Sequence, residues 1–93
     1  MKVKLLEIKL SPLKTKKLRA YFSDGTHTDF GASAYEDFTT HHDEERKARY
    51  LNRHKSREDW TDFKSAGALS RWILWNLPTL KASISDYKKR FEL

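Results

Sequence analysis

The sequence predicts an α+β fold in which an N-terminal three-stranded antiparallel sheet is packed by three C-terminal helices. Three observations carry this prediction: apolar residues alternate through residues 1–31, an Asp24-Gly25 pair separates two alternating runs, and apolar residues recur at helical spacing in the last third of the chain. Strands followed by helices are typical of a sheet with helices on one face. A length of 93 residues fits a single domain, 1–93.

The first strand is expected close to the N-terminus, where charged and aliphatic residues alternate. The alternation changes phase between Leu5 and Leu6. A β-bulge at this step, or burial of both faces of the strand, would accommodate the change. Ser11-Pro12 ends the strand, and the lysine-rich stretch 14–17 is expected to be a solvated connection.

A hairpin is expected between the second and third strands. Aromatic-rich runs flank Asp24-Gly25, and both turn residues tolerate positive φ, which is a strong hairpin signal. With a two-residue turn, Phe22 would lie opposite His27. The two faces would then carry Leu18, Ala20 and Phe22 on one side and Tyr21 and Phe30 on the other. Which of the two faces is buried stays open.

Three helices are expected after the hairpin: a basic surface helix over 39–57, a core helix over 65–76 and an amphipathic helix over 79–92. Thr39 or Thr40 can cap the first of them. The core helix is apolar nearly all round, which places it at the centre of the fold. The side chains expected to be buried together are Leu69, Trp72, Ile73, Ile84, Tyr87 and Phe91.

The clearest functional signal is a stripe of arginines on the first expected helix. At about 100° per residue, the four side chains fall within roughly 80° of one another. The stripe consists of Arg46, Arg49, Arg53 and Arg57, with His42 on the same side. Aligned guanidiniums repel one another, so the pattern indicates an anionic partner, either phosphate or a carboxylate-rich protein surface. A solvated helix with local pairs such as Glu45–Arg49 is the alternative interpretation.

The overall charge favours the same class of partner. The chain carries 19 Lys and Arg against 13 Asp and Glu, a formal net charge of +6, which favours nucleic acid or another polyanion. Secondary contacts are expected from Lys47, Lys55 and Arg71. No Asn, Gln and Arg pattern suited to base edges stands out, so we expect backbone contacts with little sequence preference.

Two other binding modes stay open at this point. A three-stranded sheet can lay its strands in a DNA major groove, in which case Arg19, Tyr21, His27 and Thr28 would make the contacts. Aromatic residues can also form a base-stacking platform. The candidates for such a platform are Tyr35, Phe38, Trp60, Phe63, Trp72 and Trp75, although core packing and loop anchoring account for them more simply.

Catalysis and cofactor binding are not predicted. The chain has no Cys, no glycine-rich phosphate loop and no G-x-S-x-G motif. His41 and His42 are adjacent and cannot ligate one metal from a single helix face. His54 is better explained by stacking on Tyr50 or as a partner of the helix C-terminus. A metal-dependent nuclease is the low-ranked alternative, with Asp37, Asp43, Asp59 and Asp62 as its possible carboxylates. We therefore expect no catalytic residue, no metal site and no cofactor.

The expected location is intracellular. No run approaches the length of a membrane span, and the N-terminus lacks the continuous apolar core of a signal peptide. We therefore expect no membrane partner and a protein that works inside a cell or is packaged inside a particle. The oligomeric state is left open.

Three segments carry a resemblance to a known family. They are DGTHTDFGASAYEDFT, HHDEERKARYLNRHKSREDW and SAGALSRWILWNLPTLKASISDYKKRF, and the match around them would run from about residue 17 to residue 91. The chain resembles an uncharacterised family of small basic proteins encoded by large DNA viruses of algae and protists. The resemblance implies a virus-encoded protein and transfers no catalytic residue.

Taken together, these patterns predict a small basic non-enzymatic module. It would dock a polyanion, foremost nucleic-acid backbone, within a viral or nucleoprotein assembly. The alternative is a minor structural protein of a virion or other large assembly, which would use the same arginines against acidic protein surfaces.

Overall fold

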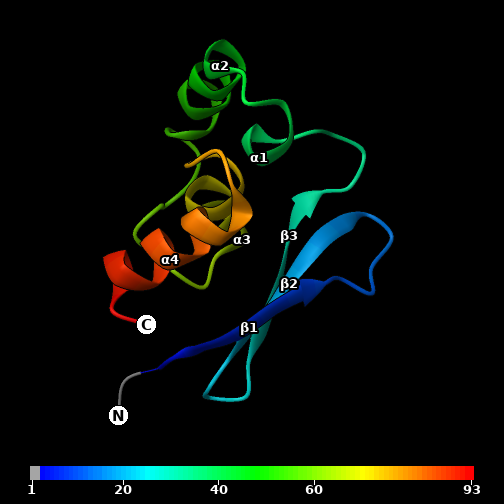
Figure 1. Cartoon of the computed structure of the whole chain (residues 1–93). Helices are drawn as coiled ribbons and strands as arrows, with labels where there is room; N and C mark the ends of the chain where they lie inside the picture. Colours follow the sequence, from blue (N-terminus) through cyan, green and yellow to red (C-terminus); the bar gives the residue numbers. More distant parts are fainter. Residues whose placement is uncertain (1–2) are drawn as a thin grey trace.

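The computed structural model describes residues 3–93 and confirms the predicted α+β fold (Figure 1). One antiparallel sheet has the strand order β1-β2-β3, so β2 is central. The strands are β1 (Leu5–Leu10), β2 (Lys16–Phe22) and β3 (His27–Ala32). The helices are α1 (Phe38–His41), α2 (Glu44–His54), α3 (Ala66–Leu69), the π-helical turn η1 (Ser70–Leu74) and α4 (Leu80–Phe91). Within the described part of the chain, no helix is both long and apolar enough to cross a membrane.

The turn at Asp24-Gly25 is confirmed, but it contains three residues rather than the expected two. The backbone N–H of Phe22 donates to the carbonyl oxygen of Thr26 over 2.9 Å. His27 therefore pairs with Tyr21, and the predicted pairing of His27 with Phe22 is wrong by one residue. Gly25 has a φ of +87°, the left-handed conformation that closes a three-residue hairpin turn.

The extra turn residue decides which face of the hairpin is buried. It places Leu18 opposite Phe30, and residues directly opposite one another share a face of the sheet. Phe30 therefore joins Leu18, Ala20 and Phe22 in the core, whereas Tyr21 lies on the other face and is half-buried.

The bulge expected in β1 is confirmed. Leu5 pairs with Phe22 while Glu7 pairs with Tyr21, so Leu6 is the additional residue. Leu5 is buried and Leu6 is exposed. The bulge thus accommodates the phase change without burying both faces of the strand.

The single helix expected over 39–57 is wrong, because the chain forms two helices there. α1 and α2 are separated by His42, which has a left-handed φ of 54°. α2 then ends at His54, before Arg57. A residue in this conformation breaks the helical hydrogen-bond ladder, and His is among the residues that adopt it more readily than most.

The helix caps also differ from expectation. Asp37 caps α1 and Asp43 caps α2, each accepting hydrogen bonds from backbone N–H groups of the first turn. Thr39 and Thr40 were the expected caps and lie inside α1 instead. A carboxylate accepts such bonds more strongly than a hydroxyl, which explains why the aspartates fix both starts.

The core helix expected over 65–76 begins as predicted but changes type. The hydroxyl oxygen of Ser65 accepts from the N–H of Ala68 over 3.1 Å and caps α3. From Ser70 onward the turn is π-helical, and the N–H of Trp75 donates to the carbonyl of Ser70 over 3.0 Å. The last helix, α4, lies within one residue of its expected bounds at each end.

The core lies between one face of the sheet and the helices α3, η1 and α4 (Figure 1). Leu69, Ile73 and Tyr87 are fully buried there, as expected. Trp72, Ile84 and Phe91 pack against this core but stay partly exposed. α2 has no buried residue and stands at the far end of the molecule from β1.

Candidate anion-binding groove

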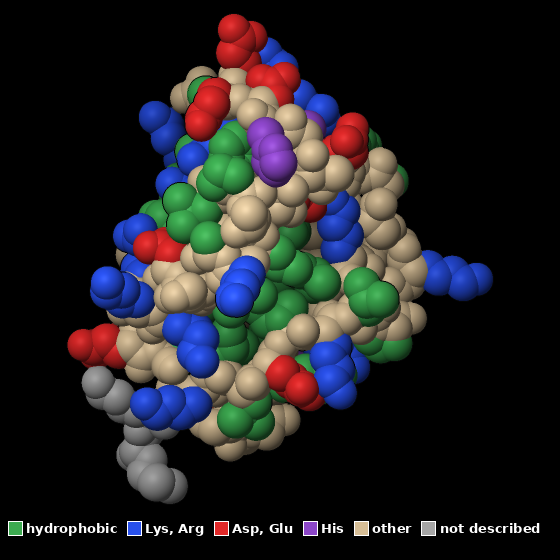
Figure 2. Space-filling model, in the orientation of Figure 1, with side chains coloured by type: hydrophobic (Ala, Val, Ile, Leu, Met, Phe, Trp, Pro, Cys, Tyr) green, Lys and Arg blue, Asp and Glu red, His purple; other side chains and the backbone are tan. Residues whose placement is uncertain are grey.

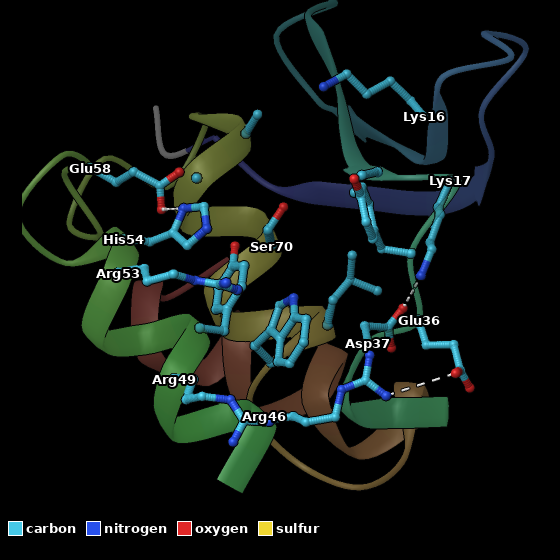
Figure 3. Close-up of a pocket in the computed structure, with 18 residues that line it drawn as sticks. Lys16, Lys17, Glu36, Asp37, Arg46, Arg49, Arg53, His54, Glu58 and Ser70 are labelled. Atoms are coloured by element: carbon cyan, nitrogen blue, oxygen red, sulfur yellow. Dashed lines mark hydrogen bonds and ion pairs between the residues drawn. The ribbon is translucent and has the colours of Figure 1, made fainter. Parts of the chain in front are cut away.

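A groove with a volume of about 640 Å³ lies between α2 on one side and the sheet on the other (Figure 3). Arginines of α2 line one wall, and lysines at the start of β2 line the other. We call it the arginine groove and define it by Arg46, Arg49, Arg53, Lys16, Lys17 and Tyr35. Three of the four predicted arginines are thus brought together in one concave site.

Two ion pairs lie in the groove, Lys17–Asp37 at 2.6 Å and Arg46–Glu36 at 3.8 Å. In addition, Nδ1 of His54 lies 3.4 Å from a carboxylate oxygen of Glu58. The two ion pairs join each wall of the groove to the loop that follows β3. The cations therefore keep their places without a bound ligand.

Positive charge is nevertheless in excess. Five Lys and Arg line the groove against three carboxylates, a formal charge of +2 with His54 neutral. Among residues 3–93, no carboxylate forms an ion pair with Arg49, Arg53 or Lys16. Both of these arginines are exposed, so their guanidiniums are available to an anion from outside.

A stack of three rings runs beside these cations. Tyr50 stacks on Trp75 at 4.2 Å between ring centroids and 5° between planes, and His54 stacks on the other face of Tyr50 at 4.2 Å. The ring of His41 lies 5.3 Å from that of Trp75 but is tilted by 55° against it. The predicted stacking of His54 on Tyr50 is confirmed. Burial, aided by the charge of Glu58, raises the pKa of Tyr50 to about 12, so its hydroxyl stays protonated.

Arg57 and Lys55 lie outside the groove. Both follow the end of α2 and are exposed. The helical stripe predicted through Arg57 therefore stops at Arg53. The positive charge of these two residues belongs to the open surface rather than to the concave site.

Three other predicted contact residues have internal partners. His42 Nε2 lies 2.9 Å from the carbonyl oxygen of Pro78, and Lys47 Nζ donates to the carbonyl oxygen of Asn76 over 2.6 Å. The guanidinium of Arg71 lies 4.1 Å from the ring centre of Trp72 and donates to the carbonyl of Trp75. Burial, together with the charge of Arg90, lowers the pKa of Arg71. None of these three side chains lines the groove.

Sequence reasoning missed the wall opposite α2. The stretch 14–17 was expected to be a solvated connection, yet Lys16 begins β2 and both Lys16 and Lys17 line the groove. Lys17 and its partner Asp37 are 20 residues apart. No local pattern in the sequence signals such a pair, because only the packing of the loop after β3 brings them together.

The outer face of the sheet offers few free side chains for the alternative in which the strands bind in a DNA major groove. Arg19 donates two hydrogen bonds to the carboxylate of Asp29, at 2.8 and 3.0 Å. Arg19 and Ser11 hold the pKa of Asp29 below its ordinary value. Thr28 lies opposite the buried Ala20, on the core-facing side of the sheet, and donates to the carbonyl of Lys64. The guanidinium fork that would read a base is therefore already occupied.

Three of the four aspartates considered for a nuclease, all except Asp62, have local roles. Asp37 and Asp43 cap helices, and Asp59 accepts hydrogen bonds from Thr61. Within the described residues, no group of three or more His, Asp or Glu is arranged to hold a metal ion. On the face drawn in Figure 2, Lys and Arg are spread among Asp and Glu rather than gathered in one patch. The concave groove, rather than net charge, is thus the distinctive feature.

Comparison with known proteins gives one match. Residues 6–54, more than half of the chain, match the model of a family described as a family of unknown function (DUF5754). This stretch covers β1 except its first residue and all of β2, β3, α1 and α2, and therefore most of both groove walls. No curated protein and no solved structure matches the chain.

Proposed function

We propose that this chain, which belongs to a family of unknown function (DUF5754), binds nucleic acid through its arginine groove. The protein is a small non-enzymatic module that binds the backbone of nucleic acid, with little sequence preference, within a viral or other nucleoprotein assembly. The observation that carries the proposal is the pair Arg49 and Arg53, whose exposed guanidiniums have no carboxylate partner in the described chain. The resemblance to small basic virus-encoded proteins supports the assembly context.

The groove suits phosphate for physical reasons. A guanidinium offers a planar fork of donors that matches phosphate oxygens, and each phosphate contact releases condensed counterions. Cations stand on both walls, so an anionic chain in the groove meets Arg49 and Arg53 on one side and Lys16 on the other. Because ion pairs already tie Arg46 and Lys17 to the loop after β3, little ordering remains to be done on binding.

The donor set supports binding without sequence preference. Among the residues that line the groove, the charged donors are Lys and Arg, and none is Asn or Gln. Amide side chains are the ones that read adenine in pairs of hydrogen bonds, whereas Lys and Arg contacts to phosphate position a strand without reading it. Affinity should therefore vary little with base sequence at a fixed salt concentration.

The test compares two variants of equal charge. Arg49→Gln with Arg53→Gln removes two groove cations, and Lys55→Gln with Arg57→Gln removes two exposed cations outside the groove. We expect the groove variant to weaken binding of a fluorescent oligonucleotide on the order of tenfold or more, because two charged hydrogen-bonding contacts are lost. The control variant should change the affinity less than about threefold, the scale of exposed charge effects.

Equal losses in the two variants would contradict the proposal, because net charge alone would then account for binding. Melting temperatures of both variants should stay close to that of the wild type, since all four side chains are exposed. This measurement separates loss of binding from loss of folding.

A second candidate is docking on an acidic protein surface. It is favoured by the carboxylates of Glu36 and Asp37, which already pair with groove cations and show that the groove geometry suits carboxylates. In that case a protein partner should co-purify in fixed stoichiometry after nuclease treatment. Loss of all partners on nuclease treatment would instead favour nucleic acid.

A further inference from the structure

We infer that the arginine groove takes a single unpaired nucleic-acid strand in preference to a duplex, and that a base of this strand stacks on Tyr35. The inference rests on the proposed function and names the form of nucleic acid that the groove accepts. DNA and RNA strands share the chemistry it requires.

The shape of the site argues against a duplex. The cations line a cavity between two walls, and Arg46 and Lys17 are only partly exposed within it. A duplex is a wide and stiff rod, so it would meet only the exposed rim at Arg49 and Arg53. An extended single strand is thin and flexible enough to lie between the walls and reach the inner cations as well.

The groove also offers apolar surface, which a base can use and a bare backbone cannot. The buried side chain of Leu74 lies at its base together with Ala66 and the edges of Tyr50 and Trp75. Both ring faces of Tyr50 are already covered by Trp75 and His54. These two neighbours leave no room for a base to insert there, so the stacking partner has to be another ring.

Tyr35 is that ring. It lines the groove, 71% of its surface is exposed, and no aromatic ring in residues 3–93 packs against it. A free aromatic face next to cations is the combination that single-strand-binding sites use, since bases stack while phosphates are held.

The position of Tyr35 is fixed by its neighbours. Its backbone N–H donates to the carbonyl oxygen of Ala32, which holds it in the turn after β3. The next two residues, Glu36 and Asp37, are paired to Arg46 on one wall and Lys17 on the other. Tyr35 therefore lines the groove directly before two residues that are tied to its opposite walls, and Figure 3 shows these two ion pairs.

The experiment measures fluorescence anisotropy with three probes of equal length at one salt concentration. The probes are a single strand, the corresponding duplex and an abasic single strand that keeps the phosphates without the bases. All three are made of DNA, and the single strand and the duplex are also made of RNA. We expect the single strand to bind at least about fivefold more tightly than either of the other probes, in line with stacking of one base.

Variants of Tyr35 isolate the stacking contact. Tyr35→Ala should weaken binding of the single strand on the order of fivefold or more, while its affinity for the abasic strand should equal that of the wild type. Tyr35→Trp should bind the single strand as tightly as the wild type. Tyr21→Ala serves as a control, because Tyr21 is on the opposite side of the sheet and does not line the groove. Because Tyr35 is exposed, its variants should keep the melting temperature of the wild type. A fall in melting temperature would therefore reveal a folding defect.

The outcomes separate this inference from the proposed function. Equal binding of single strand and duplex, or equal binding of the normal and abasic strands, overturns the inference and leaves backbone binding standing. Wild-type affinity of Tyr35→Ala for the single strand also overturns it. No binding of any probe overturns the proposed function and the inference together.

Discussion

At the scale of single residues, the aspartates of the sheet region stabilise the fold through charged hydrogen bonds. Asp29 accepts two bonds from Arg19 across the β2–β3 pair and a third from Ser11 at the end of β1. Asp24 in the hairpin turn pairs with Lys64 and accepts from Thr26. These contacts link all three strands and tie the turn to the segment before α3.

These contacts predict a loss of stability in acid. The bond from Lys64, aided by Thr26, lowers the pKa of Asp24 to about 2, and Arg19 also lowers the pKa of Asp29. A carboxyl with a lower pKa in the folded state binds its proton more readily when unfolded. Its contribution is therefore complete above about pH 4 and is lost as the pH falls through the folded-state value.

Urea unfolding at pH 7 and at pH 2.5 measures this effect. The wild type should have a lower midpoint at pH 2.5, and Asp29→Asn combined with Asp24→Asn should reduce the difference between the two midpoints. Hydrogen bonds from Thr61 also lower the pKa of Asp59. Asp59→Asn should therefore reduce the difference between the two midpoints only by the contribution of Asp59 itself. An unchanged pH dependence in the double variant would show that other carboxyl groups govern acid stability.

At the scale of elements, α2 is the least supported helix of the arginine groove. It has no buried residue, and it is tied to the rest of the molecule by the stack of Tyr50 on Trp75 and by the bond from Lys47 to Asn76. Arg46 and His54 add contacts to the carboxylates of Glu36 and Glu58. Its start is set by Asp43 and its end carries the basic residues that the helix dipole favours. α2 is thus held over the groove by a few specific contacts.

Removing the ring that anchors α2 should loosen this helix alone. In Tyr50→Ala, the amide hydrogens of α2 should exchange faster, while those of β2 and α4 keep wild-type rates, because the core does not include α2. Asn52→Ala, an exposed position on the same helix, provides the control and should leave exchange unchanged. Faster exchange throughout the sheet would show that α2 is coupled to the core.

The elements were more predictable from the sequence than their junctions. Alternation and helical spacing located the strands, the bulge at Leu6 and α4, because these patterns reflect burial of one face. The hairpin register was missed by one residue, since the sequence does not say whether the turn has two or three residues. The break at His42 was missed because Asp43, which fits the first turn of a longer helix, instead caps a new helix. The π-helical turn lies inside an apolar run that reads as an ordinary helix.

At the scale of the whole molecule, the sheet with α3, η1 and α4 forms the packed body, and α2 stands beside it with the groove in between. The arginine wall follows from helical spacing on one element, so the sequence could indicate it. The lysine wall and Tyr35 come from other elements, and only the folded arrangement places them opposite the arginines. The helical stripe also included Arg57, which α2 does not reach.

The salt dependence of binding tests the central claim that groove arginines contact phosphates. The dissociation constant of a single-stranded oligonucleotide is measured over a salt series for the wild type, for Arg49→Gln with Arg53→Gln, and for Lys55→Gln with Arg57→Gln. Each lost phosphate contact should reduce the slope of log affinity against log salt by about 0.7, so the groove variant should lose about 1.4 and the control variant little. Equal slopes in the two variants, or a wild-type affinity independent of salt, would contradict the account.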